Sequence, residues 1–273
     1  MMVETIHSKS ESAKPVRETS EKVAVSARDI TCDFGTGRGI FGVTLSVKWG
    51  SILSIMGGNG SGKTTCLRCL GLFQAIAPGG RIELAGETWT DEPDDRTNEP
   101  PTHEINHLHG RILGTVFQQA EPWPHLNVLD NLMLPLRRVG LLPDGEARVR
   151  AQEALELFGV LDRSRARHHQ LSGGLRQRVA LARTFALRPR VLLLDEVTSA
   201  LDPEWTERVR VIIRQFANYG GAVVNISHRV GFVRNLSDRI IYLDAGRVTE
   251  EGEPSSIFSN PQSDSLRRFI ENA

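Results

Sequence analysis

A glycine-rich loop after a short, mostly apolar run constrains this chain more than any other feature of its sequence. Residues 51–56 predict a buried strand, and they lead directly into Gly57-Gly58-Asn59-Gly60-Ser61-Gly62-Lys63-Thr64. A helical pattern follows over about residues 63–72. This order matches the GxxxxGK[ST] pattern of a phosphate-binding loop, where small residues let backbone N–H groups converge on one anion. A plain glycine-rich turn is the alternative, but it leaves the strand, the helix and the Lys-Thr pair unexplained.

The polar residues of this loop have distinct expected roles. The helix after the loop presents its positive N-terminal end to a bound anion. Lys63 adds a full positive charge for the β- and γ-phosphates of a nucleotide, and the Thr64 hydroxyl can ligate Mg²⁺. The loop alone does not name a function, because kinases, GTPases and motor proteins share it.

Two consecutive acids end a second apolar run. Residues 191–194 are continuously apolar, which suits a parallel strand buried on both faces. A carboxylate at the end of such a strand is desolvated unless it serves a cation, so Asp195 is a candidate Mg²⁺ ligand. Glu196 stands one position further, where it could orient or polarise an attacking water. The alternative is a strand end with two ordinary acids.

A second candidate anion site stands far from the first loop in sequence. Ser172 is a good helix N-cap, and Gly173 and Gly174 leave backbone N–H groups free at the start of a basic helix. Apolar residues at 175, 179, 182 and 186 give that helix one buried stripe. A single subunit needs one phosphate site, so this second one makes sense if it completes the site of another subunit.

Together these motifs resemble the ATP-binding subunit of ATP-binding cassette (ABC) transporters over about residues 23–270. The resemblance implies an α/β P-loop NTPase fold: a RecA-like parallel sheet core, an antiparallel β subdomain and a helical signature subdomain at about 119–188. Residues 1–21 then form a flexible N-terminal tail before an ABC ATPase domain at 22–270. The polar residues 87–110, which include three prolines, are predicted to be a surface insertion.

The resemblance also implies roles for individual residues, with ATP and Mg²⁺ as the cofactors. Glu196 is the implied catalytic glutamate, His228 the switch histidine and Gln118 the Q-loop glutamine. The implied Mg²⁺ ligands are Thr64, Gln118 and Asp195. The implied nucleotide-binding residues are Phe34, which would stack on adenine, then Gly57, Gly58, Asn59, Gly60, Ser61, Gly62, Lys63, Thr64 and Thr65, the signature residues Ser172, Gly173 and Gly174, and Asp202 of the D-loop.

Three positions depart from the family pattern. Leu175 ends the signature where the family usually has Gln, Val197 replaces the Pro that usually follows the catalytic Glu, and Gly58 stands where a bulkier residue or Pro is common. None of the three removes a group that handles phosphate, Mg²⁺ or water. The departures bear on the rate of turnover and leave the expected chemistry intact.

Two classes of ABC protein compete for this chain: a transport motor, and a soluble protein that acts on nucleic acid or ribosomes. Soluble members generally carry long coiled coils or two cassettes, and neither pattern is present. The 33 basic and 33 acidic side chains leave no basic excess, so we expect no nucleic-acid partner. Segments 121–131, 231–234, 250–252 and 260–262 are similar to those of polar amino acid importers, which favours an import subunit.

An import subunit implies specific partners. They are a second ATPase subunit in a homodimer, integral membrane permease subunits and, indirectly, a solute-binding protein. No apolar run approaches the about 20 residues that span a bilayer, and residues 1–21 lack the apolar core of a secretory signal. We therefore expect a peripheral protein on the cytoplasmic face of the cell membrane.

Cysteine and histidine spacing leaves two alternatives open. Cys66 and Cys69 form a CxxC that could be a redox pair, but a three-residue spacing in a helix places both on one face, which favours small buried residues. With Cys32 the count is odd, which argues against a disulfide framework. His103, His107 and His109 could bind a metal, although a solvated loop is the favoured interpretation.

The rest of the pattern predicts alternating strands and helices. Further strands are expected at residues 23–27, 43–47, 81–84, 112–117 and 222–226, with a hairpin of 240–243 and 247–249. Further helices are expected at residues 126–139, 145–158 and about 263–272.

Overall fold

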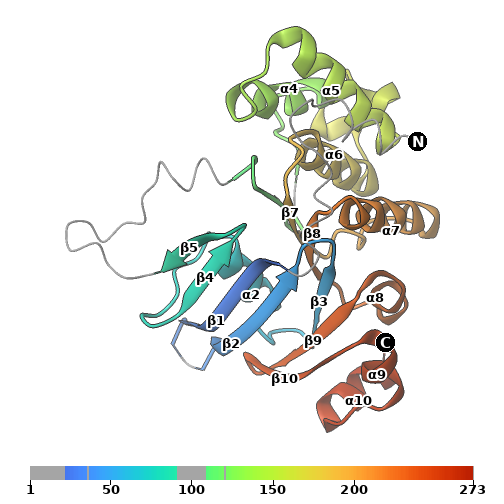
Figure 1. Cartoon of the computed structure of the whole chain (residues 1–273). Helices are drawn as coiled ribbons and strands as arrows, with labels where there is room; N and C mark the ends of the chain where they lie inside the picture. Colours follow the sequence, from blue (N-terminus) through green and yellow to red (C-terminus); the bar gives the residue numbers. More distant parts are fainter. Residues whose placement is uncertain (1–21, 36, 91–108, 120, 273) are drawn as a thin grey trace.

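A computed structural model of the chain describes residues 22–35, 37–90, 109–119 and 121–272. Within these ranges the chain forms two sheets and a set of helices, which Figure 1 shows as a lower sheet-rich part below a group of helices. The predicted tail at 1–21 and most of the predicted insertion, at 91–108, lie outside the described residues.

The larger sheet has the order β10-β9-β3-β8-β7-β6. Neighbouring strands from β9 to β6 pair in parallel, and β10 closes the other edge as an antiparallel hairpin with β9. The strands are β3 (Ile52–Met56), β6 (Leu113–Val116), β7 (Val191–Asp195), β8 (Ala222–Ile226), β9 (Arg239–Asp244) and β10 (Arg247–Gly252). Each matches a predicted strand to within a few residues at its ends.

The smaller sheet is antiparallel, with the order β2-β1-β4-β5. Its strands are β1 (Val23–Asp33), β2 (Gly39–Lys48), β4 (Arg81–Leu84) and β5 (Glu87–Thr90). The prediction for β1 stopped too early, because the strand continues through an irregularity at Asp29, whose φ is +51°. The first residues of the predicted insertion, 87–90, form β5, which pairs with β4.

Alternating faces of the parallel strands bury two separate hydrophobic clusters. Leu53 and Ile55 of β3 face helix α2 (Lys63–Leu70) and the antiparallel sheet. Ile52 of β3 and Leu194 of β7 belong to the other cluster, which includes the helices on the opposite side. Successive side chains of a strand point to opposite faces, so a continuous apolar run serves both clusters.

Three helices stand together above the sheets in Figure 1, and we call them the helical lobe. They are α4 (Val128–Arg138), α5 (Asp144–Leu157) and α6 (Gly173–Ala186), with short 3₁₀ turns at Leu161–Arg163 and His168–Gln170. The chain returns from the lobe into β7. Two further helices, α7 (Pro203–Asn218) and α8 (Val230–Leu236), follow β7 and β8 and were not predicted from sequence.

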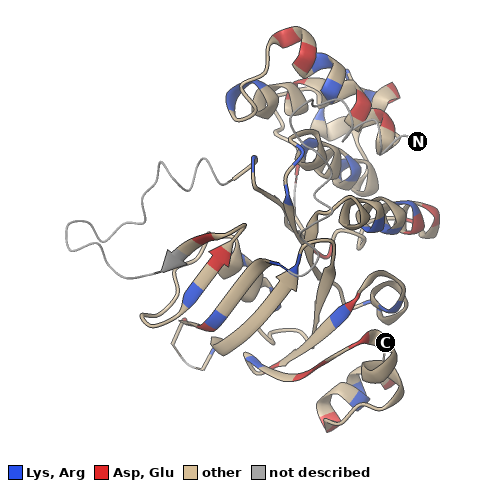
Figure 2. Ribbon diagram, in the orientation of Figure 1, with Lys and Arg blue, Asp and Glu red and all other residues tan. Residues whose placement is uncertain are grey.

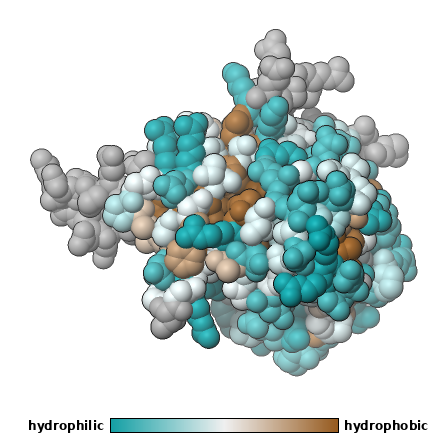
Figure 3. All heavy atoms as spheres, turned by 90° about the horizontal axis from the view of Figure 1, so that it is seen from below, coloured by the Kyte–Doolittle hydropathy of each residue, from teal (hydrophilic) through white to brown (hydrophobic). Residues whose placement is uncertain are grey.

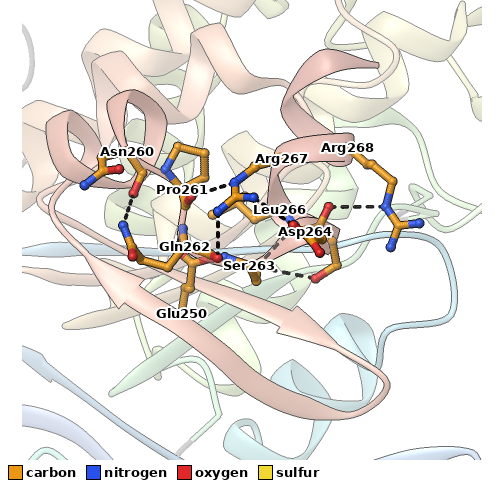
Figure 4. Close-up of polar contacts among 10 residues, drawn as sticks. Glu250, Asn260, Pro261, Gln262, Ser263, Asp264, Leu266, Arg267 and Arg268 are labelled. Carbon is orange, nitrogen blue, oxygen red and sulfur yellow. Dashed lines mark hydrogen bonds and ion pairs between the residues drawn. The ribbon is translucent and has the colours of Figure 1, made fainter.

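The C-terminal helices α9 (Pro254–Ser259) and α10 (Asp264–Glu271) are fastened to the β9–β10 hairpin. The Glu250 carboxylate accepts hydrogen bonds from the backbone N–H of Gln262 and of Ser263, just before α10 begins (Figure 4). The Tyr242 hydroxyl also donates a hydrogen bond of 3.2 Å to the Ser265 carbonyl oxygen. One carboxylate on β10 therefore fixes where the last helix starts.

Charges of both signs are mixed over the surface. Figure 2 shows basic and acidic residues side by side on α7 and within the helical lobe. The face seen from below in Figure 3 is mainly hydrophilic, with hydrophobic residues gathered in small groups. None of the helices within the described residues has the length and apolar character needed to cross a membrane.

The three cysteines confirm the prediction of small buried residues. Cys66 and Cys69 on α2 and Cys32 on β1 are all buried and none forms a disulfide. Burial raises the pKa of the Cys66 thiol to about 12. A thiol that stays protonated is a poor redox nucleophile, so the redox alternative loses its support.

The predicted solvated loop is wrong for His109, the one residue of the histidine group that the structure describes. Its ring packs on Phe73 at a centroid distance of 4.4 Å, and burial lowers its pKa. His103 and His107 lie outside the described residues. The described part of the chain holds no group of three or more His, Cys, Asp or Glu side chains that could bind a metal ion.

Candidate nucleotide-binding site

The predicted site residues follow the carboxyl ends of four neighbouring parallel strands. Along the sheet, β3 leads into the Gly57–Thr64 loop, β8 into His228, β7 into Glu196 and β6 into Gln118. Because these strands run in the same direction, their ends lie along one edge of the sheet, which we call the site edge. Residues far apart in sequence therefore meet there.

The glycines of the loop allow a backbone path that larger residues could not follow. Gly57 has φ +152°, and a β-carbon built on it would lie 2.2 Å from the Leu243 carbonyl oxygen. Gly62, at φ +100°, stands directly before α2. Substitution at either position would strain the backbone or displace a neighbour, so both glycines are needed for the loop shape.

Lys63 lies inside this loop and is buried. Its ammonium donates to the carbonyl oxygens of Gly57, at 2.9 Å, and Gly58, at 2.7 Å. Burial lowers the pKa of the Lys63 amine, and the carboxylates of Glu196 and Asp195 oppose that shift. An anion bound in the loop would offset the cost of removing this ammonium from water. A phosphate group supplies the negative charge and the acceptor oxygens to do so.

Thr64 and Asp195 form the first link between two strand ends. The Thr64 hydroxyl donates to Asp195 Oδ2 at 2.9 Å, and the Asp195 side chain is 2% exposed. Burial raises the pKa of the Asp195 carboxyl, and the bond from Thr64 opposes the shift. A buried carboxylate next to a hydroxyl oxygen fits the oxygen ligands that Mg²⁺ prefers, so the donor set suits that ion.

Glu196 is the centre of the second link. Gln118 donates from Nε2 to one Glu196 carboxylate oxygen at 3.2 Å, and His228 Nδ1 lies 3.1 Å from the other. The backbone of Glu196 has φ +48°, a left-handed conformation that is unfavourable for a residue with a side chain. Sequence reasoning found all three residues but gave no sign of this backbone conformation.

The residues Ser172–Gly174, which we call the signature start, begin α6 in the helical lobe. Ser172 caps the helix by accepting from the Leu175 N–H at 3.3 Å, and both Ser172 and Gly173 are exposed. Within the described residues, no hydrogen bond or ion pair joins the signature start to the loop residues 57–64. The structure thus brings together the strand-end residues and leaves the signature start as a separate exposed site.

The other predicted residues take varied positions. Phe34 follows β1 and is 58% exposed, which leaves its ring face open to a planar partner. Asn59 and Gly60 are exposed on the loop, and Thr65 is half-buried in α2. Asp202 caps α7 by accepting from the Trp205 N–H at 2.8 Å, so its side chain has a structural role in this chain.

Known proteins share both the sequence and the fold of this chain. The ABC transporter family model matches residues 40–199. The nopaline permease ATP-binding protein P of Agrobacterium fabrum is 37% identical over 246 residues, which cover 89% of this chain and 95% of that protein. The histidine/lysine/arginine/ornithine transport ATP-binding protein HisP of Escherichia coli is 38% identical over 249 residues, which cover 90% and 96%.

A solved structure gives the same result. The ABC transporter cassette MJ0796, solved as a dimer, superimposes with a TM-score of 0.74 at 31% identity, covering 84% of this chain and 98% of that one. The same cassette in a post-hydrolysis state bound to ADP and Pi superimposes equally well, with a TM-score of 0.74. This likeness confirms the predicted α/β P-loop NTPase fold. Since the family model matches more than half of its length, the chain belongs to the ABC transporter family.

Proposed function

We propose that this chain is the ATP-hydrolysing subunit of an ABC import system for polar amino acids. The observation that supports ATP hydrolysis is a pair of contact groups at the site edge. Thr64 hydrogen-bonds to Asp195. Glu196 contacts Gln118 and His228. The proposed solute class is supported by the relatives, whose names include transport of histidine, lysine, arginine and ornithine.

In the proposed mechanism the Lys63 loop holds the β- and γ-phosphates of ATP. Backbone N–H groups and the Lys63 ammonium neutralise the phosphate oxygens, and Phe34 stacks on the adenine. Thr64, Asp195 and Gln118 would hold Mg²⁺, which supplies positive charge to the phosphates when bound. Lys63, the backbone N–H groups and the bound Mg²⁺ would thereby stabilise the negative charge of the phosphates at a fixed place.

Glu196 carries the proton-handling part of the mechanism. Its carboxylate orients the attacking water and accepts the proton that the water loses as the water oxygen bonds to the γ-phosphorus. The bond from the γ-phosphorus to the β–γ bridging oxygen breaks at the same time, and ADP leaves with the electron pair. The Gln118 and His228 contacts hold both carboxylate oxygens, so they set the direction in which Glu196 faces. In the proposal His228 would also contact the γ-phosphate from the neighbouring strand end.

A second copy of the chain is proposed to complete each site. The exposed signature start offers a capped helix beginning and free backbone N–H groups to an anion outside its own subunit. Two chains would close head to tail around two ATP molecules, and MJ0796 shows that a similar cassette forms a dimer. Closure would drive the permease subunits toward the outside-facing state, and hydrolysis would reset them.

The remaining proposed partners are the proteins that an import system needs besides its ATPase subunits. The chain would sit peripherally on the cytoplasmic face of the membrane, against integral permease subunits. A solute-binding protein would act on the far side and never touch this chain. The solute therefore contacts none of the residues described above.

The proposed chemistry is tested by two substitutions with opposite effects. Glu196→Gln should keep ATP binding and nearly stop hydrolysis, because an amide cannot accept the proton from water. Lys63→Ala should weaken ATP binding itself, because it removes the charge opposite the phosphates. Binding of a fluorescent ATP analogue and steady-state phosphate release measure the two effects. Steady-state ATPase activity that is unchanged in Glu196→Gln would reject the role given to Glu196.

A further inference from the structure

Trp205, in the first turn of α7, contacts two guanidinium groups through its ring. The Arg178 guanidinium carbon stands 4.1 Å from the centroid of the Trp205 ring, and that of Arg208 stands 4.9 Å from it. Arg178 belongs to α6, the helix that begins with the signature start, whereas Arg208 belongs to α7. The ring is therefore the contact between α7 and the helical lobe at this place, and cation–π attraction acts on it from both helices.

Arg178 is itself fixed by the backbone of the lobe. Its Nη1 donates to the carbonyl oxygens of Phe158, at 3.3 Å, and Gly159, at 3.1 Å. Gly159 has φ +59°, and a β-carbon at that position would lie 2.5 Å from the Trp205 ring. Only glycine leaves room for the ring here, so Trp205 fills a slot made by the end of α5 and by α6.

The other end of this contact reaches the segment between β7 and α7. Asp202 accepts from the Trp205 N–H, which ties residues 199–202 to the first turn of α7. Those residues press directly on the signature start: a β-carbon on Gly174 would lie 2.9 Å from the Ala200 carbonyl oxygen, and one on Gly173 would lie 3.9 Å from the Ala200 β-carbon. The signature start thus rests on residues 199–202.

We infer that Trp205 is a positioning residue that holds the signature start and residues 199–202 as one unit, so that both reach the nucleotide of a partner subunit together. The inference rests on the proposed function, in which the signature start completes a partner's site. Two separate contacts hold these parts together: Gly174 contacts Ala200 directly, and Arg178 of α6 contacts Trp205 of α7, the helix that follows residues 199–202. A hinge between the lobe and α7 would need both to open.

Trp205→Leu tests this inference in the Glu196→Gln background, where hydrolysis does not remove ATP. Leucine keeps an apolar side chain but has no ring face for Arg178 or Arg208. We expect the protein concentration for half-maximal MgATP-dependent dimerisation to rise about tenfold, the effect of losing the partly desolvated cation–π contact with Arg178, the one of the two that joins α6 to α7. ATP affinity of the monomer should not change, because the Lys63 loop is untouched. Trp205→Phe should restore most of the lost dimerisation, because it keeps a ring face.

Trp49→Leu is the matched control. Trp49 also lies under an arginine, with the Arg190 guanidinium carbon 4.6 Å from its ring centroid. It directly follows β2 and stands three residues before β3, at the opposite end of that strand from the loop, and it is far along the chain from α6. This variant should lose thermal stability without a change in dimerisation.

Each outcome bears on a definite claim. Dimerisation of Trp205→Leu at the concentration of its Glu196→Gln parent would overturn the inference. So would an equal loss in Trp49→Leu, since the effect would then follow from stability alone. Failure of the parent itself to dimerise with MgATP would overturn the proposed shared site, and the inference with it.

Discussion

At the scale of single residues, Leu175 differs most clearly from the family pattern. Its backbone N–H donates to the Ser172 hydroxyl, and its side chain is half-buried against the hydrophobic cluster of the lobe. The family's glutamine would offer polar groups at this place, and leucine offers packing. The N-cap depends on the backbone of residue 175, so the identity of its side chain leaves the cap in place.

We predict that Leu175→Gln keeps ATPase activity at or above its present level. Glutamine has nearly the same helix propensity as leucine and restores the polar contacts of the family signature. The lost apolar contact should lower the melting temperature slightly. Parallel measurement of ATPase rate and thermal unfolding separates the two effects. Loss of activity in a folded variant would mean that Leu175 is a specialised packing residue.

At the scale of helices and strands, sequence patterns found the strand-end residues but missed elements whose partners are distant. The β5 strand was read as part of an insertion, because its pairing with β4 leaves little trace in a polar segment. Helix α7 did carry a signal: Asp202 and Pro203 suit an N-cap and first turn, and buried Val209, Ile212, Ile213 and Phe216 follow at helical spacing.

The site shows the same division between local and distant information. Lys63, Thr64, Asp195 and Glu196 could be found because each belongs to a short motif beside a recognisable strand. The bond between Thr64 and Asp195 could not be read from the chain, since it depends on strand order across the sheet. The contact between Arg178 and Trp205 was missed for the same reason.

The attachment of α10 gives a prediction about pH. Burial alone would raise the pKa of Glu250, but hydrogen bonds from Ser263 and Gln262 outweigh it, so the pKa is lower in the folded chain. A lowered folded-state pKa stabilises the fold above the unfolded value of about 4.3, and this contribution is lost as pH falls through the folded value. Glu250→Gln should therefore weaken α10 at neutral pH.

Hydrogen exchange of the α10 amides measures this effect. The native chain should protect them more than Glu250→Gln does at neutral pH, and the two should converge in acid. Glu253→Gln is a suitable control, because Glu253 is exposed and makes no hydrogen bond through its side chain within the described residues. A constant difference between native chain and Glu250→Gln down to acid pH would contradict the assignment.

At the scale of the whole molecule, two groups of residues assigned to one reaction stand on different parts of the chain. The loop, the two acids, Gln118 and His228 lie at the site edge, and the signature start lies on the helical lobe. No hydrogen bond or ion pair joins the two groups within the described residues. A shared site between two copies explains this separation, because each copy would supply one group to each nucleotide.

Light scattering with and without MgATP tests the shared site. The Glu196→Gln chain should dimerise with MgATP, because the γ-phosphate then recruits the partner's signature start. Adding Ser172→Arg should block the dimer while ATP still binds the Lys63 loop. The long arginine side chain would occupy the space between the signature start and the nucleotide of the partner subunit. A double variant that still dimerised would refute the shared site. ATPase activity of a monomer that is independent of protein concentration would favour a self-contained enzyme.

The position of the site edge has an evolutionary consequence. Every group assigned to ATP chemistry on this edge is anchored to a buried strand, where substitutions destabilise the fold. Substitutions on the exposed faces of α4 and α5 cost less stability. A lineage could therefore acquire a new solute through changes in its permease and solute-binding protein, while the residues of the site edge stay the same. Chimeras that exchange β3, β6, β7 and β8 between relatives with different solutes should keep ATPase activity and leave the solute range unchanged, because the permease and the solute-binding protein set that range.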